Sequence, residues 1–100
     1  MTILVTIRVP GDYNELVKYV NANKESFLAV SAKGKAAGAI HHQFYGGVNE
    51  VLVVDEWPSE EAFGEFFRGT PEIKGIIESA GATGPPDVSV YEKLDIGDDF

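Results

Sequence analysis

Two adjacent histidines and an acidic residue near a tryptophan are the side chains of this chain best suited to chemistry. His41 and His42 lie in one stretch with strand character, and Asp55 and Trp57 end the next. An imidazole can act as a general base near neutral pH or ligate a haem iron. A carboxylate can orient that imidazole or bind a substrate hydroxyl. His42 and Asp55 are therefore the candidate catalytic residues.

Strand alternation decides which of these side chains can act together. Successive side chains of a strand point to opposite faces, so His41 and His42 cannot chelate one metal ion. His42 shares a face with Asp55 and Trp57, whereas His41 faces a surface that a second subunit would cover. Each residue also has a purely structural alternative, which is a hydrogen-bonded core histidine for His42 and a solvated strand-end carboxylate for Asp55.

Aromatic side chains predict the wall of an apolar pocket. Phe63 and Phe66 recur at helical spacing, and Phe44 shares the face of His42. Aromatic walls suit an aromatic ligand, although packing within the core is the alternative for each ring. The tyrosines offer phenol donors, and Tyr91 is the one assigned to the pocket. The predicted substrate-binding set is Trp57, Phe63, Phe66, Phe44, His41 and Tyr91.

Composition excludes several classes of function. The net charge is -8, with 8 Lys and Arg against 16 Asp and Glu, so neither nucleic acid nor an anionic membrane surface is an expected partner. The absence of cysteine excludes disulfides and thiolate metal sites, and it fits a cytoplasmic protein. The apolar start, residues 1–9, is too short to span a membrane and lacks the features of a secretory signal. No metal-ligand spacing and no phosphate-binding loop is present, so we expect no metal.

The first half of the chain reads as a strand followed by a helix. Apolar residues alternate over 3–9, which predicts a strand ended by Pro10. Asp12 is the expected helix N-cap. The helix is predicted to continue to about Ser31, with Asn21 and Asn23 able to weaken or kink it, and to end at residues 33–35, where a glycine lies between two lysines.

A hairpin is predicted next. Strands over 37–45 and 48–57 flank the pair Gly46-Gly47, which can supply the positive φ angles of a two-residue turn. That turn places His42 opposite Val51. Both faces of the hairpin carry large apolar side chains, so both faces must be covered.

The second half repeats the helix-then-strand order. Ser59 is the expected cap of a helix, Thr70 the cap of a further segment to about Ala80, and a final strand includes Val88 and Val90. The order βαββαβ is that of a ferredoxin-like α+β fold, with an antiparallel sheet and helices on one face. The other face is left for a homodimer partner. Residues 1–95 form the single expected domain, and residues 96–100 an acidic tail.

A resemblance to known proteins rests mainly on residues 51–67, VLVVDEWPSEEAFGEFF. A hydrophobic strand ending in an acidic residue and Trp, followed by a Ser-Glu-Glu-Ala helix start, resembles the antibiotic biosynthesis monooxygenase domains of the dimeric α+β barrel superfamily. The resemblance implies a homodimer with a sheet-to-sheet interface. Its members include cofactor-free oxygenases that act on aromatic polyketides, haem-degrading enzymes and signalling-related proteins.

The haem-degrading branch can be tested on this sequence. Its members carry an Asn in the first strand and a Trp and a His in the second helix region. Aligned on Trp57, the last two positions fall on Phe66 and near Ile76, and residues 2–9 contain no Asn. These departures argue against that site. Haem ligation by His41 or His42 in another geometry stays open.

The sequence therefore leads to three hypotheses. The first is a small cofactor-independent monooxygenase-like enzyme that acts on an apolar, aromatic or polyketide-like molecule, with His42 as base and Asp55 as its positioning group. The second is a non-catalytic ligand- or haem-binding dimer, and the third a structural or regulatory dimer. Isomerase or lyase activity is not separated from oxygenation by the sequence.

Overall fold

Residues 2–100 are described by a computed structural model; Met1, the first residue of the expected 1–95 domain, lies outside them. Four strands form one antiparallel sheet in the order β2-β3-β1-β4. The strands are β1 (Ile3–Pro10), β2 (His41–Gly47), β3 (Glu50–Trp57) and β4 (Asp87–Glu92). The helices are α1 (Tyr13–Ala22), α2 (Lys24–Ala36), α3 (Glu60–Gly69) and α4 (Glu72–Ser79). This is the ferredoxin-like α+β fold that the sequence predicts.

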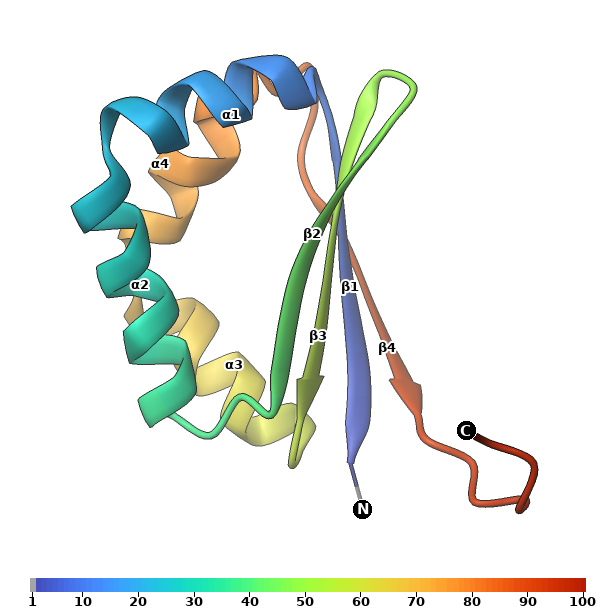
Figure 1. The fold of residues 1–100 in the computed structure, drawn as a ribbon. Helices are drawn as coiled ribbons and strands as arrows, with labels where there is room; N and C mark the ends of the chain where they lie inside the picture. The colour runs from blue at the N-terminus through green and yellow to red at the C-terminus, as the bar shows by residue number, and fades with distance from the viewer. Residues whose placement is uncertain (1) are drawn as a thin grey trace.

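One face of the sheet is covered and the other is open. All four helices lie on the same side of the sheet (Figure 1). On β1 and β3 every second side chain is buried, because these positions point toward the helices. The buried set on these strands is Ile3, Val5, Ile7, Val9, Val51, Val53, Asp55 and Trp57. The two central strands therefore supply the floor of the core.

The hairpin turn differs from the prediction. Gly46 and Gly47 belong to β2, and the two-residue turn is Val48-Asn49, in which Asn49 has φ 58°. Asparagine is among the few residues that adopt this left-handed conformation readily. The predicted pairing of His42 with Val51 is wrong, since His42 lies opposite Asp55. The register moves by an even number of residues, so the predicted faces are kept.

The first helix is divided into two at Asn23, one of the two asparagines predicted to weaken or kink it. Asn23 leaves the helical conformation at φ -132° and ψ 38°, and it ends α1 where α2 begins. Its side-chain amide donates to the carbonyl of Tyr19 at 3.0 Å. The predicted end at residues 33–35 is also wrong, because α2 continues to Ala36 and Gly34 is buried within it. The second strand starts correspondingly later than predicted, at His41.

Of the two side-chain N-caps predicted for α3 and α4, only that of α3 is present. The Ser59 side chain accepts from the backbone N–H of Ala62 at 3.1 Å, which confirms the cap of α3. Thr70 does not cap α4 through its side chain; its backbone carbonyl accepts from Ile73, and α4 starts after Pro71. Pro71 has the fixed φ that suits a helix start, so the second segment begins without a side-chain cap.

The C-terminal segment leaves the sheet after β4. Residues 93–100 are exposed and trail away from the body of the molecule (Figure 1). The apolar side chains of Leu94 and Ile96 are each 71% exposed. Of the helices within residues 2–100, none has the length and apolarity needed to cross a membrane.

The two glycines before the turn give a matched stability test. A Cβ added at Gly46 would lie 2.6 Å from Cγ of Tyr13, a ring atom close to the α1 backbone, whereas one at Gly47 meets only the flexible Glu50 side chain. We expect Gly46→Ala to lower the free energy of unfolding by about 1–3 kcal/mol. Gly47→Ala should change it by less than about 0.5 kcal/mol. Urea denaturation measures both, and equal effects would contradict the close α1–β2 approach.

Candidate functional site

A cavity of about 380 Å³ lies between the sheet and the helices. Its floor is formed by side chains of the three strands β1, β2 and β3, and α3 and α4 close one side. The lining is mainly apolar, with Ser31, Lys35, His41, His42 and Asp55 as its polar members. Such a lining suits an apolar ligand that a few polar groups orient.

Helix α2 forms the roof of this cavity. Phe27, Val30, Ser31 and Gly34 recur at helical spacing and all line it. The helix is held at a few points: Phe27 contacts Phe44 of β2 with ring centroids 5.5 Å apart, and Gly34 is the only buried residue of α2. A Cβ at Gly34 would lie 3.3 Å from Cζ of Phe66, so glycine allows α2 to approach α3 closely.

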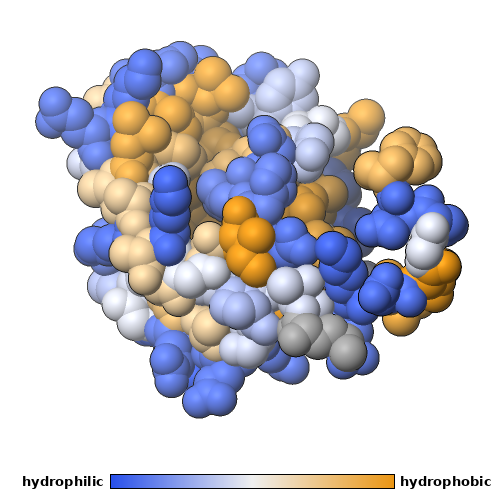
Figure 2. All heavy atoms as spheres, turned by 60° about the horizontal axis from the view of Figure 1, so that its bottom comes forward, coloured by the Kyte–Doolittle hydropathy of each residue, from blue (hydrophilic) through white to orange (hydrophobic). Residues whose placement is uncertain are grey.

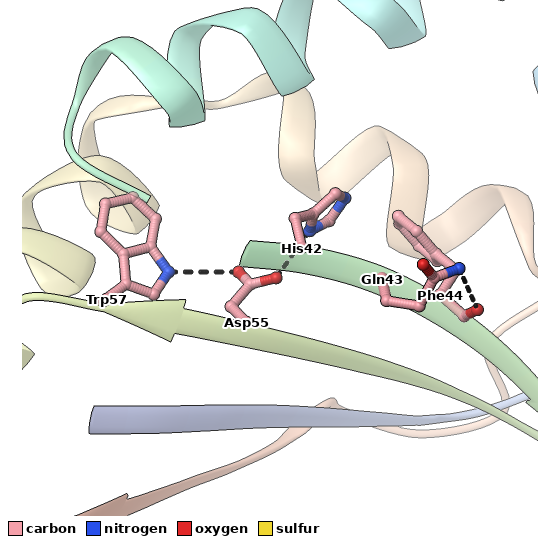
Figure 3. Close-up of polar contacts among 5 residues, drawn as sticks. All are labelled: His42, Gln43, Phe44, Asp55 and Trp57. Atoms are coloured by element: carbon pink, nitrogen blue, oxygen red, sulfur yellow. Dashed lines mark hydrogen bonds and ion pairs between the residues drawn. The ribbon is translucent and has the colours of Figure 1, made fainter. Parts of the chain in front are cut away.

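His42 and Asp55 form a hydrogen-bonded pair on the cavity floor. Nδ1 of His42 lies 2.6 Å from Oδ1 of Asp55 across the β2–β3 pair. The Asp55 side chain is 9% exposed and that of His42 38% exposed. Figure 3 shows the imidazole rising toward the helices, with one ring nitrogen turned to Asp55 and the other away from it. The pair joins a buried carboxylate to an imidazole that solvent or a ligand can reach.

Trp57 donates a hydrogen bond to the second oxygen of the same carboxylate. Its indole N–H donates to Oδ2 of Asp55 at 3.2 Å, and the ring itself is 1% exposed (Figure 3). Phe63 and Phe66 of α3 pack on the indole, with centroids 5.9 and 5.4 Å away. No buried side-chain nitrogen or oxygen within residues 2–100 lacks a hydrogen-bond partner. Both oxygens of Asp55 are thus held by fixed donors.

This arrangement determines which nitrogen of His42 can take up a proton. A carboxylate only accepts hydrogen bonds, so the neutral imidazole carries its hydrogen on Nδ1. Nε2 then has a free lone pair on the side away from Asp55. A base held by a carboxylate in this way can remove a proton from a hydroxyl or an activated carbon and hold the positive charge. Phe44 fixes the ring from one side, at 5.1 Å and edge to face.

Most of the predicted site residues meet at this cavity. His41, His42, Phe44, Asp55, Trp57, Phe63 and Phe66 all line it. His41 borders the cavity at the start of β2, where strand alternation gives it the sheet face opposite to that of His42. Tyr91 is not part of this cavity: it pairs with Leu4 on β1, so it faces the open side of the sheet and is 54% exposed.

Sequence reasoning missed the α2 side of the cavity. The sequence pattern predicts these residues only as a continuation of the first helix that ends near Gly34. The available signal was the spacing of Phe27, Val30 and Ser31, which is helical and continues to Gly34. That signal is weak, because exposed residues such as Leu28, 55% exposed, interrupt the apolar stripe.

An ion pair joins the roof to α4. Nζ of Lys33 lies 2.6 Å from Oε2 of Glu72. This hydrogen bond lowers the pKa of the Glu72 carboxyl. The stabilisation is therefore present above the ordinary carboxyl pKa and is lost as the pH falls through the lowered value. Both groups are exposed, so the pair contributes little to the stability of the fold. Within residues 2–100 no three His, Asp or Glu side chains cluster to hold a metal ion.

Solved structures share this fold. A monooxygenase from the gene ActVA-Orf6 of Streptomyces coelicolor, in complex with nanaomycin D, is 17% identical over 94% of this chain and 89% of that one, with a TM-score of 0.66. A protein from Caulobacter crescentus, named for antibiotic biosynthesis monooxygenases, is 19% identical over 94% and 91%, with a TM-score of 0.65. A dimeric ferredoxin-like protein from an uncultured marine organism is 15% identical over 94% and 89%, with a TM-score of 0.66.

These similarities lie in structure rather than in sequence. No family model matches the chain, and no curated protein is similar to it in sequence. At these identities the likeness shows the fold, which is the ferredoxin-like fold of proteins named antibiotic biosynthesis monooxygenases. The resemblance noted in the sequence is confirmed at that level. A shared fold does not assign an activity, which depends on the residues of the cavity itself.

The tautomer of His42 gives a direct test of the site geometry. In the protein labelled with ¹⁵N, we expect the neutral His42 ring to carry its hydrogen on Nδ1, because Asp55 accepts there. Asp55→Asn should shift this population toward the Nε2–H form. The chain has only two histidines, and His41 serves as the internal reference. An Nε2–H tautomer in the unaltered protein would contradict the pair.

Proposed function

We propose that this protein is a small cofactor-independent monooxygenase-like enzyme that acts on an apolar aromatic or polyketide-like molecule bound in the cavity. One observation carries the proposal: the 2.6 Å His42–Asp55 pair presents a free imidazole nitrogen to an apolar cavity of about 380 Å³. The similar fold of a monooxygenase in complex with nanaomycin D supports it.

His42 begins the reaction as the general base. Its Nε2 removes a proton from an activated phenol or from the enolisable carbon of an aromatic ketone. Asp55 keeps Nδ1–H in place and balances the imidazolium charge that forms. The apolar lining keeps water from the resulting anion. Trp57, Phe63 and Phe66 give the cavity flat aromatic surfaces against which a planar substrate can lie.

Molecular oxygen is the oxidant. The substrate anion gives its electrons to O₂, and a C–O bond forms at the carbon that carries the negative charge, which is the deprotonated carbon of a ketone or the ring carbon conjugated with a phenolate oxygen. The terminal peroxide oxygen takes the proton back from His42, which restores the neutral imidazole. The hydroperoxide R₂CH–OOH then loses water to give R₂C=O. One R₂CH₂ and one O₂ thus give one R₂C=O and one H₂O, so atoms and electrons balance without a further reductant.

Anthrone is a suitable test substrate because it is a planar aromatic ketone with an acidic CH₂ group. We expect the protein to catalyse its conversion to anthraquinone with one O₂ consumed per product. His42→Asn should lower kcat by about 10²- to 10⁴-fold, the usual contribution of a positioned base. An oxygen electrode and absorbance of the product measure both quantities.

Gln43→Ala is the matched control for this substitution. Gln43 neighbours His42 on β2 but does not line the cavity, and its side chain bonds only to the adjacent Phe44 carbonyl at 3.3 Å. Its activity should equal that of the unaltered protein. If His42→Asn folds and retains full activity, the base assignment is wrong. A Soret band on haem titration that requires His42 would favour the haem-binding alternative instead.

We further propose that the protein is a cytoplasmic homodimer joined through the open sheet face. That face carries partly or largely exposed apolar side chains, including Leu4, Tyr45, Leu52, Val54 and Tyr91. Water contact with so many apolar groups is unfavourable, and a second copy would remove it. A dimeric ferredoxin-like protein of similar structure supports this assembly. The lack of cysteine fits a reducing compartment.

Val54 tests the interface because it pairs with Thr6 and Gln43 near the middle of the open face. We expect the unaltered protein to sediment at twice its 10.8 kDa chain mass. Val54→Glu should give a folded monomer, since a buried unpaired carboxylate would oppose association. Val48→Glu, in the turn at an 89% exposed position, should remain dimeric. A monomeric unaltered protein would overturn the assembly.

A further inference from the structure

Lys35 lines the cavity but has no part in the proposed proton transfer. It lies in the last turn of α2, is exposed, and is the only lysine or arginine among the lining residues. Ser31 precedes it by one turn and also lines the cavity. Residues four apart on a helix are neighbours on its surface. Lys35 and Ser31 are therefore neighbouring polar residues at the edge of an otherwise apolar roof.

Lys35 differs from the lysine two positions before it. Lys33 is paired with Glu72 at 2.6 Å, whereas Lys35 makes no ion pair with any residue of the described range 2–100. The one acidic group that lines the cavity, Asp55, already accepts hydrogen bonds on both oxygens from His42 and Trp57. The charge of Lys35 is thus available to a ligand.

Capping of the helix end does not account for Lys35. Cations near a helix C-terminus can bond its last carbonyls. Here backbone N–H groups already supply donors to three carbonyls of the last turn. These bonds run from Ala37 to Lys33 at 2.9 Å, from Gly38 to Lys35 at 3.1 Å and from Ala39 to Gly34 at 3.0 Å.

We propose that Lys35, assisted by Ser31, forms an anion subsite at the cavity edge, so that the ligand is an aromatic molecule that carries a carboxylate. The aromatic body lies on the apolar floor, and the carboxylate stays at the partly solvated edge. Without such a cation, the net charge of -8 would disfavour an anionic ligand. The proposal rests on the proposed function, because it uses the same cavity for the same molecule.

Figure 2 shows hydrophobic and hydrophilic side chains interspersed over the lower end of the molecule in Figure 1, where α2 ends and β2 begins. A purely apolar ligand would leave the Lys35 ammonium unpaired beside it, and a small polar acid would leave the apolar floor unused.

Two probes of nearly equal shape separate the charge from the aromatic body. These are 2-naphthoate and its neutral amide, 2-naphthamide, titrated by calorimetry at pH 8.5, where an ordinary imidazole is uncharged. We expect Lys35→Met to weaken 2-naphthoate binding by about 3- to 10-fold, as for a partly exposed charge-assisted hydrogen bond. It should leave 2-naphthamide binding unchanged. Added salt should weaken only the acid in the unaltered protein.

Lys24→Met is the matched control. Lys24 lies in the first turn of the same helix, makes no ion pair with any of residues 2–100, and does not line the cavity. It changes the net charge equally, and 2-naphthoate affinity should change by less than about 2-fold, as expected for a distant screened charge. Equal loss in both variants, or no loss in Lys35→Met, overturns the subsite.

The outcomes separate this inference from the proposed function. If the amide and the acid bind alike and Lys35→Met affects neither, the anion subsite is wrong while the cavity still binds aromatic molecules. If neither probe binds, both proposals fail. If Lys35→Met weakens the acid alone but His42→Asn leaves anthrone oxidation unchanged, the subsite stands and the base assignment fails.

Discussion

The buried carboxylate of Asp55 is the constraint on which the rest of the site depends. An ionised group at this depth is costly unless donors hold it. Here the Trp57 indole and the His42 imidazole supply one donor each, to the two oxygens. The three residues come from β2 and β3, so the pairing of these strands is also the geometry of the site. A register shift by one residue would turn one partner to the other face.

The same tryptophan connects the site to the helical layer. Its ring packs on Phe63 and Phe66, and Phe66 in turn meets α2 at Gly34. A series of contacts therefore runs from Gly34 of α2 through Phe66 to Trp57, whose indole donates to Asp55. Helix α2 itself packs sparsely, since only one of its residues is buried. A cavity remains beneath it because α2 stands away from the sheet instead of filling that space.

The sheet and the helices thus make different contributions to the site: the sheet fixes the hydrogen-bond geometry, and the helices enclose the cavity. The strands hold the polar groups within hydrogen-bond distance and provide a rigid floor. The helices supply aromatic walls and one free ammonium at the edge. The open face of the sheet is independent of the cavity, because strand alternation sends its side chains the opposite way. Association through that face would leave the His42–Asp55 pair in place.

The sequence by itself determined the order of the elements, their faces and the main members of the site. Period-two alternation placed His42, Asp55 and Trp57 on one face. A change of strand register by an even number of residues leaves them on the same face. The sequence did not determine the turn, because Gly46-Gly47 has the composition of a turn while Gly46 is needed for contact with Tyr13.

Tertiary structure decided the direct pairing of His42 with Asp55, which followed from Asn49 taking the left-handed turn position. The sequence indicated a weak point at Asn21 or Asn23, and tertiary structure decided that the helix breaks fully at Asn23 and that α2 then brings Lys35 to the cavity. Local propensity shows that asparagine weakens a helix interior, but it does not decide between a kink and a complete break. Packing between segments far apart in the sequence decides the geometry of the helix, and local sequence patterns do not report that packing.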